Sequence, residues 1–198
     1  MSLSTYAELK SSVANWLNRT DLTAEIPDFI KLAETRIAHE VRLPTIEKTA
    51  SMTLNAQGAV AIPADFLELI DVFYNDKPLD RISLTQLRGL TPRSGVPVCF
   101  ARDGKELVFF PTPATQTDTL VVKYYYQVPD LSDSATTNDL FATIPEMYLF
   151  GALSEAATFL GADNGRWEQS YQTAFNRAVA HNRSAEVAGS SPQIQSGY

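Results

Sequence analysis

The sequence has little of the side-chain chemistry on which most enzymes and metal sites depend. It contains one cysteine, two histidines and two tryptophans among 198 residues. The single cysteine, Cys99, excludes an intrachain disulfide framework and a cysteine-rich zinc site. We expect Cys99 to occupy an ordinary position in a strand.

Long apolar segments are missing as well. No window approaches the roughly 20 consecutive apolar residues that a membrane-spanning helix needs. The segment Met1–Lys10 has neither the basic start nor the apolar stretch of a signal peptide. We therefore expect no membrane partner, and a protein that is made and kept in a cytoplasm or packed into a particle.

The chain also lacks a basic region. Its net charge is −7, and residues 1–44, 45–144 and 145–198 each carry more acidic than basic side chains. Gripping nucleic acid requires clustered Lys and Arg that neutralise phosphates, so a nucleic-acid-binding protein is disfavoured. A mildly acidic wall is compatible with a protein that merely surrounds passing DNA, because it does not hold back a polyanion.

Catalytic motifs are absent from the sequence. It has no His-Glu-x-x-His pair, Gly-x-Ser-x-Gly elbow, phosphate-binding glycine loop or Gly-x-Gly-x-x-Gly fingerprint. His39 is predicted late in a helix, and His181 in the last turns of another, where a cation suits the helix dipole. We expect neither histidine to carry chemistry, and we predict no catalytic residue, cofactor or metal site.

One enzymatic alternative stays open, a cell-wall glycoside hydrolase carried by a virion, because two carboxylates suffice for glycoside hydrolysis. Glu34 and Glu40 are its candidates. Six residues of helix turn through about 600°, which places these two side chains on opposite sides of the helix. Next to Arg36 and Arg42, they are more simply interpreted as a solvated, ion-paired helix face.

What the sequence does contain is typical of a globular chain of ordinary domain size: 44% hydrophobic and 10% aromatic residues. The first 44 residues predict two amphipathic helices. Thr5 and Glu8 form a capping box ahead of a helical stripe of Tyr6, Leu9, Val13, Trp16 and Leu17. After polar residues 18–23, Pro27 suits a first turn. A second stripe then follows, formed by Phe29, Ile30, Ala33, Ile37 and Val41, and it stops before Pro44.

The period changes to that of β structure from Thr45 onward. Residues 45–54 and 59–62 flank a turn at residues 55–58, which predicts a hairpin. Residues 69–74 form a third predicted strand, and the chain turns at residues 75–78.

The second half of this β segment contains the strongest local signal. Residues 83–90 are compatible with one short helix. Residues 96–102 and 105–110 flank Asp103 and Gly104, and this predicts a hairpin because a type I′ turn needs positive φ. Residues 119–126 complete the β structure, and the polar stretch 129–143 is predicted to be a connecting loop.

Three consecutive tyrosines, residues 124–126, raise a third class of function, binding of a carbohydrate or receptor. Consecutive strand residues alternate between faces, however, so the three rings cannot form one platform. A role in the core and in a subunit interface is favoured over sugar binding.

Helices return at Pro145. Residues 145–160 are apolar nearly all round and are followed by Gly161, which predicts a helix at the centre of the core. A last helix, residues 164–186, presents a stripe of Trp167, Tyr171, Phe175, Ala178 and Val179. The polar residues 189–198 are expected to be mobile in the free chain.

The predicted fold class is α+β: mainly a helical bundle of two N-terminal and two C-terminal helices, with an inserted antiparallel β subdomain and a flexible C-terminal tail. Residues 1–44 and 145–188 would form the bundle, residues 45–144 the inserted β subdomain, and residues 189–198 a C-terminal arm.

This organisation resembles the head-to-tail connector (adaptor) proteins of tailed bacteriophages. The resemblance covers nearly the whole chain and rests on the order of elements. These are the helical pair Tyr6–Leu17 and Phe29–Leu43, the β insertion, the second pair Tyr148–Leu160 and Trp167–Ala180, and the polar tail.

The resemblance implies a structural virion protein of the neck or tail, assembled in the host cytoplasm. In that family the helical bundles pack side by side into a ring, usually of twelve subunits, on the portal protein. The ring joins the capsid to a downstream tail or nozzle protein and leaves a channel through which DNA passes without specific binding. Another structural component of the tail remains an alternative.

The resemblance also implies a portal-binding arm. Residues 189–198 would order on the portal through Ser190, Pro192, Ile194 and Tyr198, with Ile194 and Tyr198 as the main anchors. The isolated subunit is then expected to be monomeric, because an arm that orders only on the portal withholds part of the interface energy until then.

Overall fold

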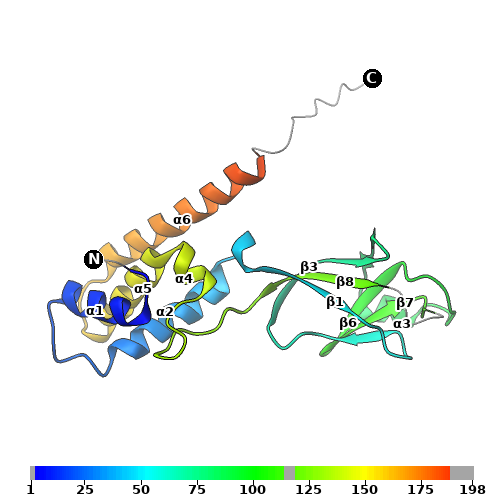
Figure 1. The fold of residues 1–198 in the computed structure, drawn as a ribbon, viewed down its shortest axis with the longest axis horizontal. Coiled ribbons are helices and arrows are strands. Elements are labelled where there is room, and N and C mark those ends of the chain that lie inside the picture. The colour runs from blue at the N-terminus through cyan, green and yellow to red at the C-terminus, as the bar shows by residue number, and fades with distance from the viewer. Residues whose placement is uncertain (1–2, 114–118, 188–198) are drawn as a thin grey trace, which may run out of the picture. The chain divides into compact units, whose positions relative to one another are not determined.

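The computed structural model describes residues 3–113 and 119–187, with side chains as far as residue 182. The chain divides into two compact units, a helical unit of residues 1–46 and 128–198 and a β unit of residues 47–127 (Figure 1). The combination of helices with mainly antiparallel sheets confirms the predicted α+β class. None of the described helices is both long enough and apolar enough to cross a bilayer.

The helical unit begins with the two predicted amphipathic helices. α1 spans Tyr6–Leu17, and its N-terminus has the predicted capping box, in which Thr5 and Glu8 bond each other's backbone. α2 spans Ile26–Glu40 with a proline in its first turn, and the short 3-10 helix η1 spans Pro44–Ile46. These local signals therefore predicted the first two helices correctly.

α5, Pro145–Phe159, is the central helix of this unit. Nine of its residues are buried, and it packs against α1, α2 and α6 (Gly165–Val187), as Figure 1 shows. α5 approaches α2 closely at Gly151, where an added Cβ would lie 2.9 Å from the Cβ of Ala33. The sequence-based prediction that this helix is central to the core is confirmed.

The prediction of a plain connecting loop at residues 129–143 was wrong in its last third. Residues Asp139–Thr143 form the short helix α4, capped by Asn138, whose Oδ1 accepts a hydrogen bond from the N–H of Phe141 at 2.8 Å. Leu140 and Phe141 are buried, and the Phe141 ring contacts that of Tyr148. The many polar residues around this short apolar segment led to the prediction of a loop.

The β unit contains two four-stranded sheets. The first has the order β1-β8-β3-β4, and the second has the order β2-β7-β6-β5. Their bounds are Glu47–Met52 (β1), Ala59–Ala61 (β2), Phe66–Tyr74 (β3), Lys77–Pro78 (β4), Asp80–Arg81 (β5), Cys99–Asp103 (β6), Glu106–Phe110 (β7) and Leu120–Tyr126 (β8). All strand pairs are antiparallel except β5–β6, and a short helix, α3, spans Leu84–Arg88. Both sheets contribute to one core, for example through Tyr124 and Phe109.

The hairpin predicted for residues 45–62 does not form. The chain does turn at Asn55–Gly58, but β1 pairs with β8 and β2 pairs with β7, so the two strands belong to different sheets. A local turn signal cannot distinguish a hairpin from a crossing between sheets, because the partner strands are distant in sequence.

The predicted second hairpin is present, with its turn displaced by one residue. Asp103 pairs with Glu106, so the turn residues are Gly104 and Lys105. Among the described residues of this turn, only Gly104 has positive φ, at +60°. A turn with positive φ at its first central position favours glycine there, and Gly104 occupies that position. The type I′ turn predicted for Asp103 and Gly104, with positive φ at both residues, does not form.

Candidate assembly surface

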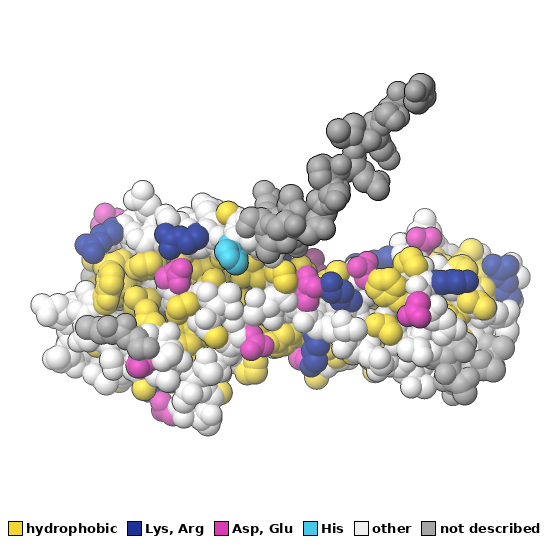
Figure 2. All heavy atoms as spheres, turned by 45° about the horizontal axis from the view of Figure 1, so that its top comes forward, with side chains coloured by type: hydrophobic (Ala, Val, Ile, Leu, Met, Phe, Trp, Pro, Cys, Tyr) yellow, Lys and Arg dark blue, Asp and Glu magenta, His cyan; other side chains and the backbone are white. Residues whose placement is uncertain are grey.

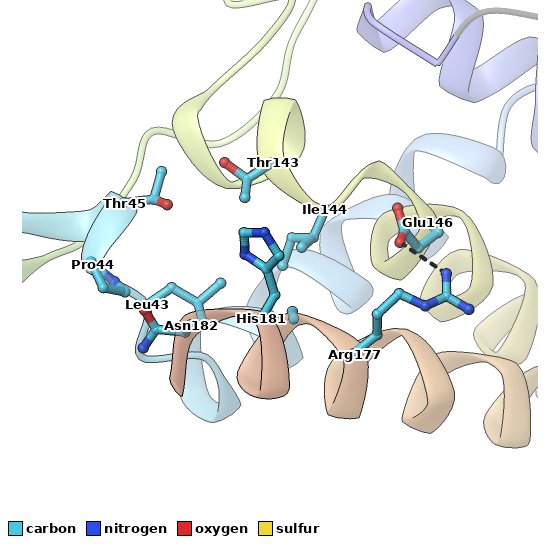
Figure 3. Close-up of a pocket in the computed structure, with 10 residues that line it drawn as sticks. Leu43, Pro44, Thr45, Thr143, Ile144, Glu146, Arg177, His181 and Asn182 are labelled. Atoms are coloured by element: carbon cyan, nitrogen blue, oxygen red, sulfur yellow. Dashed lines mark ion pairs between the residues drawn. The ribbon is translucent and has the colours of Figure 1, made fainter. Parts of the chain in front are cut away.

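An apolar pocket of about 400 Å³ lies in the helical unit, beside the C-terminal half of α6. Its apolar wall comes from Leu43, Pro44, Ile144 and Ala178. His181 extends from α6 into the space between Thr45, Thr143 and Ile144, as Figure 3 shows. We call this cavity the Ile144 pocket.

A second depression, of about 500 Å³, continues along α6 toward its N-terminus. Phe150 of α5 and Ala174 of α6 form its floor, and the polar face of α6 from Arg166 to Thr173 forms its side. Glu146 and Arg177 line both cavities, and their charged groups approach to 3.8 Å (Figure 3). The two cavities are therefore adjacent along α6, and we call them together the α5–α6 groove.

Three aromatic rings close the N-terminal end of this groove. The ring centroid of Trp16 lies 5.9 Å from that of Phe150 and 5.6 Å from that of Trp167. Trp16 is nevertheless 46% exposed, so this member of the predicted α1 stripe is not a core residue. Figure 2 shows a band of hydrophobic side chains over the helices, with basic and acidic side chains along its border. Exposed aromatic clusters of this kind are typical of protein interfaces.

The position of α6, and with it the groove, is fixed by a charged network centred on Arg36 of α2. The Arg36 guanidinium donates two hydrogen bonds to the Glu168 carboxylate, at 2.8 and 2.5 Å, and one to Glu40 at 3.0 Å. Its Cζ also lies 4.0 Å from the centroid of the Tyr171 ring, whose hydroxyl donates to Glu40 at 2.7 Å. The hydrogen bonds from Arg36 lower the pKa of Glu168 to about 2. Such bidentate pairs specify geometry as well as adding energy.

The structure does not support a glycoside hydrolase site at Glu34 and Glu40. Glu40 is bonded to Arg36 and Tyr171. Glu34 is only 7% exposed and accepts a hydrogen bond from the N–H of Leu131 at 2.7 Å. A sugar cannot reach so buried a carboxyl, and the interpretation of Glu34 as part of a solvated, ion-paired face was wrong.

Burial of Glu34 has a consequence for stability. Desolvation raises the pKa of its carboxyl to about 7, despite the bond from Leu131. Nearby charged groups are those of Asp130 and Lys31, which form an ion pair. A carboxyl whose pKa is higher in the folded state than in the unfolded chain makes folding take up a proton, so stability falls as pH rises between the two pKa values.

We expect the helical unit of the wild-type protein to lose stability between about pH 5 and about pH 7.5, by about 2 kcal/mol more than a Glu34→Gln variant. Glutamine keeps an acceptor for Leu131 but does not ionise. Both tryptophans lie in the helical unit, so urea unfolding followed by tryptophan fluorescence measures that unit. Equal pH dependence in the two proteins would contradict this account.

The other residues singled out from the sequence occupy ordinary positions in strands and helices and form no site. Cys99 is buried in β6, as expected. Tyr124 is buried and donates a hydrogen bond to Asp65 at 3.0 Å, which leaves no tyrosine platform for a sugar. His39 is exposed in the last turn of α2. Within the described side chains, no group of three or more His, Cys, Asp or Glu residues could hold a metal ion.

The expected portal-binding residues Ser190, Pro192, Ile194 and Tyr198 lie outside the described part of the chain. The α5–α6 groove, in contrast, was not anticipated. Its walls come from short segments at the ends of helices, such as Leu43–Thr45 and Thr143–Ile144. Only tertiary packing brings these segments together. Trp16 gave no signal of its exposure in the sequence, because its spacing continues that of the buried Leu9 and Val13.

Comparison with known protein families gives one match. The family model described as SU10 adaptor protein matches residues 4–195, and so spans both units and the groove. No curated protein sequence matches the chain at a significant level.

Proposed function

Because this chain belongs to the SU10 adaptor protein family, whose members are structural adaptor proteins of phages, we propose that it is the head-to-tail adaptor of its virion. The match over residues 4–195 is the observation that carries the proposal, since it includes the helices, the β unit and most of the tail. The family implies interaction with portal and tail components and a location in the virion.

In the proposed assembly, a ring of subunits, twelve in the simplest case, binds the portal protein and joins the capsid to the tail. The helical unit forms the ring and the β unit faces a downstream tail or nozzle protein. DNA passes through the central channel without specific binding. The net charge of −7 supports this last point, because an acidic wall does not retain DNA.

We assign portal binding to residues 189–198, with Ser190, Pro192, Ile194 and Tyr198 as contact residues. A segment that orders only when bound makes few productive contacts before the partner is present. Subunits should then be monomeric in solution and assemble in the host cytoplasm on the portal. The surface that joins neighbouring subunits is considered separately below.

The test is electron microscopy of the purified protein mixed with the portal protein of its own phage at micromolar concentrations. We expect an added ring of density at the tail-facing end of the portal. Portals that remain bare under these conditions would refute the adaptor function.

A variant lacking residues 189–198 separates the arm from the rest of the chain. It should fail to decorate portals while its tryptophan-fluorescence unfolding curve stays unchanged, because a segment that orders only on the portal does not stabilise the free subunit. Full decoration by the truncated protein would refute the assignment of the arm.

A further inference from the structure

The helical unit has a second exposed apolar surface, away from the α5–α6 groove. Phe159, the last residue of α5, is 61% exposed, and Leu160, which follows it, is 36% exposed. Leu32 of α2 is 53% exposed. The ring of Phe159 contacts that of Phe29 with centroids 5.4 Å apart. Leu32 is one turn from Phe29 on α2, and so lies on the same side of that helix. We call these three residues the Leu32 patch.

Acidic residues border this patch. Asp28 precedes Leu32 by one turn of α2, Glu155 precedes Phe159 by one turn of α5, and Asp163 follows Leu160 closely. The nearby basic groups are already paired within the unit, since Lys31 contacts Asp130 and Arg36 contacts Glu168 and Glu40. The Leu32 patch is therefore an apolar surface with a negative border.

The lining of the groove has two arginines, Arg166 and Arg177, and one carboxylate, Glu146, and so has the opposite net sign. The guanidinium of Arg166 lies 4.4 Å from the centroid of the Trp167 ring, at the aromatic end of the groove. Arg177 is 72% exposed near the middle, where its guanidinium lies 3.8 Å from the carboxylate of Glu146. From Trp167 to His181 the groove follows α6 for about 21 Å, at about 1.5 Å per residue. It can accept a compact apolar patch with acidic surroundings.

We propose that the α5–α6 groove binds the Leu32 patch of a second copy of this chain. The two surfaces are different, and each chain carries both, so the contact is head-to-tail. Contacts of this type generate a closed ring whenever the rotation between neighbours closes. The proposal rests on the proposed adaptor function, because it names the surface through which the ring subunits meet.

Complementary charges select this pairing over the alternatives. Two Leu32 patches facing each other would bring acidic borders together, and two grooves would bring Arg166 and Arg177 together; like charges across an interface are unfavourable. The aromatic residues Trp16, Phe150 and Trp167 provide the kind of anchors that dominate interface energies.

Cross-linking of virion necks tests the contact directly. Leu32→Cys and Thr173→Cys are combined in a Cys99→Ala phage, since both positions are exposed and Thr173 lines the groove. A short bismaleimide added to isolated necks should produce a ladder of products larger than dimers. Each single-cysteine variant is the matched control and should stay monomeric. Dimers of the Leu32→Cys variant alone would overturn the proposal in favour of a symmetric contact.

A second measurement does not depend on cysteine geometry. Leu32→Lys places a cation against the arginine border of the groove and should lower the fraction of portals that carry a ring at least tenfold. Ala180→Lys, on an exposed part of α6 outside the groove lining, is the control and should decorate portals normally.

The outcomes separate this proposal from the adaptor function. If wild-type protein decorates portals but the double-cysteine necks give no ladder and Leu32→Lys assembles normally, the ring uses another surface and only the present proposal fails. Bare portals with wild-type protein would refute the adaptor function itself, and this proposal with it.

Discussion

Replacement of Gly151 by valine is expected to destabilise the helical unit by about 3 kcal/mol or more. Gly151 is buried where α5 crosses α2, and even a single Cβ at this position would lie 2.9 Å from the Cβ of Ala33 and 3.6 Å from Cδ2 of Tyr171. Valine adds two further methyl groups, so the helices must separate. The midpoint of urea unfolding, followed by tryptophan fluorescence, should fall accordingly.

Two comparisons make this test specific. Ala180→Val introduces the same residue at an exposed position of α6 and should cost only about 0.5 kcal/mol, from helix propensity. The exchange of Ala33→Gly with Gly151→Ala moves one methyl group across the same contact. It should be less destabilising than Gly151→Ala alone if the contact causes the cost. A Gly151→Val protein as stable as the wild type would show that α2 and α5 do not pack as described.

Removal of the Arg36 side chain should have the second largest effect. An Arg36→Ala variant is expected to lose about 2–3 kcal/mol, because Glu168 and Glu40 lose their guanidinium partner at a partly buried site. The side chains of Arg36 and Glu168 are 25% and 36% exposed, and solvent screening keeps the loss below that of a fully buried pair. Urea unfolding at neutral pH measures the difference.

The pH dependence of this loss identifies its origin. The pKa of Glu168 is lowered to about 2 by Arg36, from an ordinary value of 4.5. The stabilisation is therefore complete above about pH 4.5 and disappears as pH falls toward 2, so the wild type and Arg36→Ala should converge on acidification. Arg19→Ala is the control, because the Arg19–Asp21 pair is 43% and 60% exposed, so solvent screening should leave stability almost unchanged when it is removed. A constant difference down to low pH would assign the loss to packing of the arginine stem.

Sequence patterns predicted the helices because the signals for helices are local. The capping box at Thr5, the proline in the first turn of α2 and the apolar residues of α5 each act within a few residues of the chain. The pairing of β1 with β8 joins residues 68 to 78 positions apart, and no turn signal contains that information. For this reason residues 45–62 were assigned to a hairpin that does not exist.

Functional surfaces were harder to predict than helices and strands. The charge of Glu34 suggested a solvent-facing position, but this residue lies one turn from both Ile30 and Ile37 and is buried, with a hydrogen bond from the distant Leu131. The Leu32 patch draws on two helices, and the contact of Phe159 with Phe29, which brings the end of α5 to the side of α2 that carries Leu32, depends on tertiary packing. Gly151, within an apolar helix, could have been recognised as a site of close packing, because glycine there lowers helix propensity without a local reason.

The β unit begins and ends on neighbouring strands. Glu47, its first residue, pairs with Tyr125, two positions before its last residue, and Cα atoms of directly paired residues in antiparallel strands lie about 5 Å apart. Residues 46 and 128 of the helical unit are therefore joined to positions of the β unit that lie close together. Any folded insert with adjacent ends can be joined to them in the same way. The β unit can thus be exchanged as a cassette without displacing the ends of the helices to which it is attached.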